Sequence, residues 1–199
     1  MKRLTCVSLA AATLLGASLI TVSRAQAQDC NDFATSGGWI VPIEGVLANF
    51  GAGGGINQGQ PLFGYLTYLD HRTAPPLMVS AQEVTAYCQL ACAPEGCLSR
   101  QITYTNATVR VGNDVCTGVT VIVQVLDCGE PGTADTFAIC ILANDCFGGY
   151  CASGVLGGDN QPSGGNVKVH AADPSCGVVV PICEAPPTEC TCLTTCILP

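Results

Sequence analysis

The stretch TGVTVIVQVLD, from Thr117 to Asp127, decides the fold class. Valine occupies every second position from 119 to 125, and the positions between hold Thr120, Ile122, Gln124 and Leu126. β-Branched residues favour extended chain, and a strand that is apolar on both faces is typical of the centre of a buried sheet. The sequence therefore predicts a central strand of a sandwich.

A turn follows this strand at Gly129-Glu130-Pro131-Gly132, where proline presets one dihedral angle and glycine accepts a positive one. A hairpin centred near Pro131 places residues at equal distances from the turn opposite each other. A second turn near Asp145 acts in the same way on the next pair of strands. The two turns predict two disulfide pairings: Cys116 with Cys146, and Cys140 with Cys151.

Further stretches rich in Val, Ile, Thr and Tyr, separated by Gly, Asn, Asp and Pro, extend this pattern in both directions. The predicted strands are Trp39 to Phe50, Leu62 to Leu69, Leu77 to Cys88, Gln101 to Val111, Val115 to Asp127, Thr136 to Leu142, Tyr150 to Leu156 and Asn166 to His170. We expect an all-β protein, a single antiparallel β-sandwich or jelly-roll-like domain over residues 28–170. Residues 171–199, rich in Cys and Pro, are expected to form an irregular extension pinned by disulfides.

The first 27 residues have the features of a secretory signal peptide. Lys2 and Arg3 precede an apolar stretch, and Ala25-Gln26-Ala27 has the small-x-small pattern that signal peptidase accepts. The apolar stretch is short and contains several hydroxyl residues, which disfavours the alternative of a retained membrane anchor. The expectation is a secreted or cell-surface protein, with the periplasm as another possible compartment and no membrane insertion after cleavage.

Cysteine content supports an oxidising compartment. Of the 15 cysteines, Cys6 lies in the predicted signal, which leaves an even number for the mature chain. No CxxC motif occurs, which disfavours zinc fingers, thioredoxin-like redox sites and c-type haem attachment. The candidates for structural disulfides are Cys30, Cys88, Cys92, Cys97, Cys116, Cys128, Cys140, Cys146, Cys151, Cys176, Cys183, Cys190, Cys192 and Cys196.

Charge narrows the range of partners. All 15 acidic residues follow the predicted signal, whereas only Arg72, Arg100, Arg110 and Lys168 provide positive charge there. Phosphates would be repelled by such a chain, so nucleic acid is excluded as an expected partner, as are anionic membrane surfaces. Other surface proteins and glycans remain as expected partners, and the sequence does not indicate an oligomeric state.

Two groups of residues are weak candidates for metal binding. Asp70, His71 and His170 could form a site with two histidines and one carboxylate, or they could anchor strand ends by hydrogen bonds. Asp127, Glu130 and Asp135 could bind calcium, or they could accept hydrogen bonds from the amides of a turn. We expect no cofactor, with calcium as the alternative.

Signals for catalysis are weak. Glu44 and Glu83 could take part in glycoside hydrolysis, but nothing selects a carboxylate pair. Ser153 lacks the Gly-x-Ser-x-Gly frame, and the glycine cluster from Gly51 to Gly55 lacks the end of a phosphate loop and is expected to be a flexible loop. The aromatic residues that could form a platform for stacking on sugars are Trp39, Tyr65, Tyr68, Tyr87, Tyr104 and Tyr150.

Several segments together resemble the post-COAP domain, a small β-rich module of exported bacterial proteins. They are GYLTYLDH (64–71), DCGEPGTADTF (127–137), GYCASG (149–154) and GGNVKVH (164–170), preceded by GGWI (37–40) and ANFG (48–51). The resemblance spans about residues 37–170 and implies export and association with surface or extracellular proteins, without an enzymatic activity. Cys128, Cys140 and Cys151 depart from the family pattern, as do the Cys88–Cys97 loop and the tail after His170.

The expected function is a non-enzymatic, disulfide-stabilised module with a structural or adhesion role at the cell surface or outside the cell. A calcium- or carbohydrate-binding module is the first alternative. A metal-dependent enzyme that uses His71 and His170 is the second.

Overall fold

A computed structural model describes residues 30–42, 46–57, 60–91, 93–156 and 163–183. These residues form an almost entirely β structure with one short 3-10 helix, η1 (Pro174–Cys176). The strands are β1 (Asn31–Ile40), β2 (Ala48–Asn57), β3 (Phe63–Asp70), β4 (Leu77–Ala81), β5 (Glu83–Cys88), β6 (Leu98–Val111), β7 (Asp114–Asp127), β8 (Asp135–Ile141), β9 (Tyr150–Leu156) and β10 (Gly164–His170).

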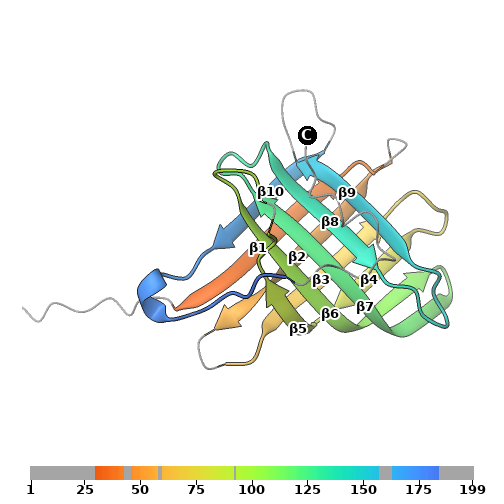
Figure 1. Ribbon diagram of the computed structural model, residues 1–199. Coiled ribbons are helices and arrows are strands. Elements are labelled where there is room, and N and C mark those ends of the chain that lie inside the picture. The colour runs from red at the N-terminus through yellow and green to blue at the C-terminus, as the bar shows by residue number, and fades with distance from the viewer. Residues whose placement is uncertain (1–29, 43–45, 58–59, 92, 157–162, 184–199) are drawn as a thin grey trace, which may run out of the picture.

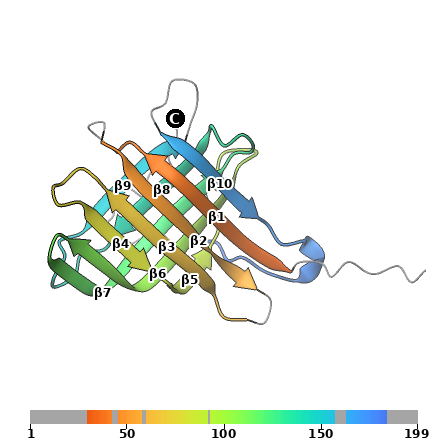
Figure 2. The same ribbon diagram turned by 180° about the vertical axis from the view of Figure 1, so that it is seen from behind.

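All ten strands belong to one antiparallel sheet, with the order β10-β1-β2-β3-β4-β6-β7-β8-β9 and with β5 also paired to β6. The sheet folds over on itself into two layers, which confirms the predicted sandwich. Strands β6 to β9 form the front layer in Figure 1. Strands β10, β1, β2, β3 and β4 form the other layer, which faces the viewer in Figure 2.

Strand β6 joins the two layers. Its C-terminal end pairs with β4, whereas its N-terminal part pairs with β5, and β7 follows it along most of its length. The β6–β7 pairing has two register shifts near Asn106, whose φ angle of 53° lies in the left-handed region. Bulges of this kind bend a strand and increase its twist, which lets β6 pass from one layer to the other.

The core lies between the layers and depends on the valines of β7. Val119, Val121 and Val123 are fully buried, and the ring of Phe137 stacks on that of Phe50 from the opposite layer, with centroids 3.8 Å apart. Ile122 lies on the other face of β7 and joins a second, smaller cluster outside the main core. The prediction of a central strand with two apolar faces is therefore confirmed.

Two predicted strands were wrong in their extent. The stretch Trp39 to Phe50 contains the end of β1 and the start of β2, and β1 begins earlier, at Asn31. The stretch Leu77 to Cys88 is divided at Gln82 into β4 and β5, which both pair with β6. The glycine cluster from Gly51 to Gly55 is part of β2 and not a loop, because β1 and β3 pair with it on both sides.

The register of the β7–β8 hairpin agrees with the predicted turn near Pro131, and Cys116 forms the expected disulfide with Cys146. Cys140 and Cys151 lie directly opposite each other on β8 and β9, as predicted, with their Sγ atoms 2.7 Å apart. Three further disulfides are described: Cys30–Cys176, Cys88–Cys183 and Cys97–Cys128. The predicted signal peptide and Cys92, Cys190, Cys192 and Cys196 lie outside the described residues.

The segment after β10 is fastened to the sandwich as far as residue 183. The Ala172 amide donates to Asp32, whose buried carboxylate also forms an ion pair with Arg100. Cys183 forms a disulfide with Cys88, and its amide donates to the carbonyl of Gln89 over 2.9 Å. The described part of the extension is thus held by both disulfides and backbone hydrogen bonds. In the described ranges, no helix is long and apolar enough to span a membrane.

Candidate ligand-binding face

The outer face of the layer β10-β1-β2-β3-β4 is built from rows of residues that lie opposite each other on neighbouring strands. Side chains alternate between the two faces of a strand, so each outward row is separated from the next by a buried row. One outward row, which we call the Trp39 row, contains Trp39, Asn49, Leu69, Met78 and Arg110. The next outward row, the hydroxyl row, contains Gly37, Gly51, Thr67, Ser80 and Thr108.

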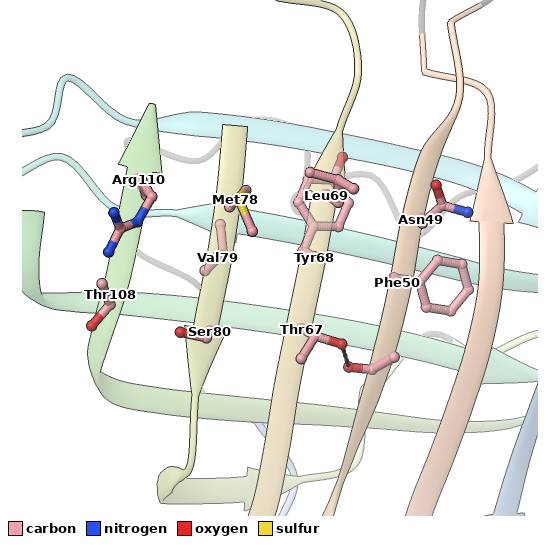
Figure 3. A pocket seen from close by; sticks show the side chains of 11 residues that line it. Asn49, Phe50, Thr67, Tyr68, Leu69, Met78, Val79, Ser80, Thr108 and Arg110 are labelled. Atoms are coloured by element: carbon pink, nitrogen blue, oxygen red, sulfur yellow. Dashed lines mark hydrogen bonds between the residues drawn. The ribbon is translucent and has the colours of Figure 1, made fainter. Parts of the chain in front are cut away.

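The members of these two rows on β2, β3, β4 and β6 line a groove of about 390 Å³, which we call the outer groove, and Trp39 lies beside it on β1. Figure 3 shows Arg110 and Thr108 at one end of the groove and Asn49 at the other, with Met78, Ser80, Leu69 and Thr67 between them. The side chains of the hydroxyl row are small and leave space above the sheet. The larger side chains of the Trp39 row border this space on one side. The groove therefore combines apolar side chains with hydroxyl groups in two neighbouring rows that cross the strands.

Several groups in and beside the outer groove are open to a ligand. Met78 is 48% exposed and Trp39 is 40% exposed. The Thr67 hydroxyl has only a long hydrogen bond, 3.4 Å, to the carbonyl of Gly51. Arg110 is exposed and, within the described residues, forms no ion pair, whereas Arg72, Arg100 and Lys168 each pair with an acid. The groove thus offers polar groups that intramolecular contacts leave available.

Aromatic residues continue this face beyond the outer groove. The ring of Tyr65, which is 49% exposed, lies over the glycines of β2, because a Cβ at Gly53 would come within 3.2 Å of it. The indole of Trp39 covers Gly164 of β10 in the same way. Phe33 lies between Phe63 and the ring of His170, with centroids 6.3 and 4.3 Å away. Glycines beneath these rings make the face flat.

The predicted sugar-stacking residues are divided by the fold. Trp39 and Tyr65 lie on the open face, but Tyr68, Tyr87 and Tyr104 are buried, and Tyr150 is half-buried. Burial raises the pKa of all four of these latter phenols, which are hydrogen bonded inside the protein. Phe33, Phe63, Met78 and the hydroxyl row were not among the binding residues predicted from the sequence. Strand alternation identifies such outward positions, but the order of the strands is needed to bring them together.

The structure does not bring Asp70 and His71 together with His170. Asp70 lies in the row of Ile40, whereas His170 lies in the row of Phe33, seven residues away along β1, which corresponds to about 23 Å. His71 Nε2 donates to Asn49 Oδ1 at 3.0 Å beside the outer groove. His71 thus makes a side-chain hydrogen bond, whereas the ring of His170 stacks on that of Phe33.

Asp70 instead belongs to a cluster with Arg72, Tyr68 and Tyr150. The amide and Nε of Arg72 donate to its carboxylate over 2.8 and 2.7 Å. The Tyr150 hydroxyl also donates to Asp70 and accepts a hydrogen bond from Tyr68 over 2.6 Å. Burial acts to raise the pKa of Asp70, but the hydrogen bonds from Tyr150 and Arg72 outweigh it and lower the pKa.

The acidic turn that was a candidate for calcium joins the two layers. Asp127 accepts from the amides of Gly129 and Val169, and Asp135 accepts from those of Cys128 and Val167. Each of the two carboxylates therefore accepts a hydrogen bond from one backbone amide of β10. Burial and, to a lesser extent, nearby Asp127 and Glu130 raise the pKa of Asp135.

The third residue of this group, Glu130, is exposed and forms an ion pair with Lys168 over 3.3 Å. Within the described ranges, no group of three or more His, Cys, Asp or Glu residues is placed to hold a metal ion. Of the two candidate glycosidase acids, Glu83 accepts a hydrogen bond from Asn106, and Glu44 lies outside the described residues.

No protein-family model, no curated protein and no solved structure matches the chain.

Proposed function

We propose that this chain is an exported, non-catalytic module that attaches to carbohydrate through the outer groove and the aromatic face beside it. The observation that carries the proposal is the pair of rows that cross five strands, one with hydroxyl groups and one with large side chains. Attachment of this kind is a form of the adhesion role expected from the sequence. The resemblance to the post-COAP domain stays a prediction that points to the same extracellular setting.

The shape and chemistry of the face suit an extended sugar chain. Sugar rings present apolar C–H groups on one side and hydroxyl groups at their edges, so they pair well with aromatic rings and with Thr, Ser, Asn and Arg side chains. Five strands cover about 19 Å across the sheet, which is long enough for a short oligosaccharide. The net charge of −8 favours a neutral glycan over a polyanionic one.

The composition of the groove supports binding without catalysis. Among the described residues that line it, none is Asp, Glu, His or Cys. Glycoside hydrolysis ordinarily requires two carboxylates on either side of the scissile bond. A bound sugar in this groove would therefore meet hydrogen-bonding groups and apolar surface, and no acid–base pair.

The described disulfides support a role outside the cell. They fasten the residue before β1 to η1, the end of β5 to the segment after β10, the residue before β6 to the residue after β7, and β7 to the segment between β8 and β9. Cross-links of this kind limit unfolding and persist in oxidising compartments. A module held in this way would keep its binding face intact after export.

Depletion experiments with insoluble cellulose, chitin and xylan would test this proposal, followed by calorimetry with soluble oligosaccharides of the polymer that binds. We expect Trp39→Ala to weaken binding about tenfold or more, because a stacking contact and its apolar area are lost. Thr67→Val should weaken it less, because it removes one hydroxyl group and keeps the shape.

Val155→Ala is the matched control, because Val155 is 37% exposed on β9 in the other layer. We expect its affinity to equal that of the wild type. Failure of all three polysaccharides and their oligosaccharides to bind would overturn the proposal. Equal losses in Trp39→Ala and Val155→Ala would place binding elsewhere and would overturn it as well.

A further inference from the structure

A second cavity, of about 400 Å³, lies at the end of the sandwich and is separate from the outer groove. It is bordered by the end of β3, the start of β4, the end of β6 and the chain before β9. We call it the end cavity. Its volume falls within the usual range for a small-molecule site.

The walls of the end cavity are mostly apolar. Leu77, Val111 and Phe147 contribute hydrocarbon side chains; Leu77 belongs to the core, and Val111 and Phe147 pack against it. Tyr150 contributes its ring, with its hydroxyl group turned to Asp70 and Tyr68. A ligand in this cavity must therefore have an apolar body to replace the water that such walls exclude.

Arg72 is the basic residue that lines the cavity. Its guanidinium lies 4.9 Å from the centroid of the Tyr150 ring, and its side chain is 25% exposed, compared with 3% for that of Asp70. The side-chain contact with Asp70 uses Nε, so the Nη groups can serve a second acceptor. A carboxylate is the acceptor whose planar geometry best fits an arginine fork.

Asp70 does not occupy the Nη groups of Arg72 that such a ligand would contact. Its Oδ1 accepts from the Arg72 amide, and its Oδ2 accepts from Arg72 Nε and the Tyr150 hydroxyl. Asp70 is the only acid among the described lining residues, and its carboxylate forms an ion pair with Arg72. The cavity therefore combines mostly apolar walls with one ion-paired arginine whose hydrogen bonds to Asp70 use only the backbone amide and Nε.

We infer that the end cavity binds a small apolar carboxylic acid. The hydrocarbon body lies against Leu77, Val111 and Phe147, and the carboxylate accepts hydrogen bonds from the Nη groups of Arg72. This site is independent of the outer groove, and its ligand differs in charge, size and polarity from a neutral glycan.

Benzoate, benzyl alcohol and benzylamine test the inference, because they share a ring and carry a negative, neutral or positive group at pH 7. Saturation-transfer NMR and calorimetry on the full oxidised chain would compare the three. We expect benzoate to bind about tenfold or more tightly than benzyl alcohol, because its hydrogen bonds to Arg72 are charge-assisted. Benzylamine should not bind measurably, since it would approach a cation.

Two variants and a control locate the site. Arg72→Gln should weaken benzoate about tenfold or more, and Val111→Phe should block the cavity while keeping Arg72 and Asp70. Arg110→Gln removes a cation from the outer groove and should leave benzoate affinity unchanged. Thermal unfolding of each variant identifies any that does not fold, and Val111→Phe keeps the test valid if Arg72→Gln fails to fold.

Three results would overturn the inference: no benzoate binding to the wild type, equal binding of all three compounds, or unchanged benzoate affinity in folded Val111→Phe. Loss of benzoate binding in Arg72→Gln with unchanged glycan binding would separate this site from the proposed glycan-binding function. Loss of glycan binding in Trp39→Ala with unchanged benzoate binding would do so in the other direction.

Discussion

The outer faces of the two layers differ, although the same alternation of side chains produces both. On β7 and β8 the outward residues Ile122, Ala138 and Cys140 are nearly inaccessible, at 5%, 2% and 0% exposure. On β1, β3 and β4 the outward residues Trp39, Tyr65 and Met78 are between 40% and 49% exposed. One layer thus has a second small core on its outside, and the other has an open face.

This difference indicates where a ligand can bind. Ile122, Ala138 and Cys140 on the outside of β7 and β8 already pack against each other and contribute to stability. Exposed aromatic residues beside polar ones, in contrast, mark a surface for a partner. We therefore expect changes on the covered face to affect folding and changes on the open face to affect binding.

A charge placed on each face should show the largest difference in stability between the two faces. Ile122→Lys would bury an unpaired ammonium group in the covered face and should lower the free energy of unfolding by about 4 kcal/mol or more. Ser80→Lys on the open face should change it by about 0.5 kcal/mol or less. Denaturation in guanidinium chloride with intact disulfides measures both. Similar losses in the two variants would contradict the distinction between the faces.

The contact between the β7–β8 turn and β10, which joins the two layers, should give the next largest effect on stability. Both oxygens of Asp135 accept backbone amides, from Cys128 and Val167 over 2.9 and 2.8 Å. Asp135→Asn would turn an NH₂ group toward one of these donors, so we expect a loss of about 1 to 3 kcal/mol in the free energy of unfolding. Asp114→Asn, at an exposed position, is the control and should be nearly neutral. Hydrogen exchange at Val167 would show whether β10 separates first.

Substitutions at two glycines of β2 should separate effects on stability from effects on binding within the open face. A Cβ at Gly55 would lie 2.4 Å from the carbonyl oxygen of Asp32, so Gly55→Ala should cost about 1 to 3 kcal/mol in stability. A Cβ at Gly51 would meet only the side chain of Thr67 within 3.4 Å, at 3.2 Å. Gly51→Ala should therefore keep the stability within about 1 kcal/mol of wild type and weaken glycan binding at the floor of the groove. Thermal unfolding and calorimetry separate these effects.

Acid should produce the smallest effect, through three carboxylates. Burial acts to raise the pKa of Asp32 and Asp70, but the hydrogen bonds from arginine and tyrosine outweigh it and lower both values. Their contribution to stability is present above the unfolded pKa of about 4 and is lost as pH falls through the lowered values. Burial raises the pKa of Asp135, so its contribution is present at low pH and is lost as pH rises through the raised value.

We therefore expect the free energy of unfolding to decrease below about pH 4, because the unfolded chain binds protons at Asp32 and Asp70 before the folded protein does. Guanidinium denaturation of the oxidised protein between pH 2 and 7 measures this dependence. Asp70→Asn should reduce the acid-induced decrease, and Asp114→Asn should leave it unchanged. Stability that increases steadily below pH 4 would contradict the signs assigned to Asp32 and Asp70.

Much of the β7–β8–β9 half was predictable because its signals are local. Alternating valines, the Pro131 turn and symmetric spacing predicted the central strand and the Cys116–Cys146 disulfide. The glycine-rich β2 was misjudged, because glycine has low intrinsic strand propensity and its pairing depends on β1 and β3. The division of Leu77 to Cys88 was also missed, because both parts are strands and only the bend of β6 separates them.

The sequence by itself determined an acidic, cysteine-rich, antiparallel β protein, because composition, period-two alternation and turn residues act over a few neighbouring positions. Tertiary structure alone decided which outward residues share a row, since Trp39, Leu69, Met78 and Arg110 come from four strands. It also decided that Asp70 contacts Tyr150 and not His170. Strand order is set by packing of the whole core, and a site formed across strands follows from that order.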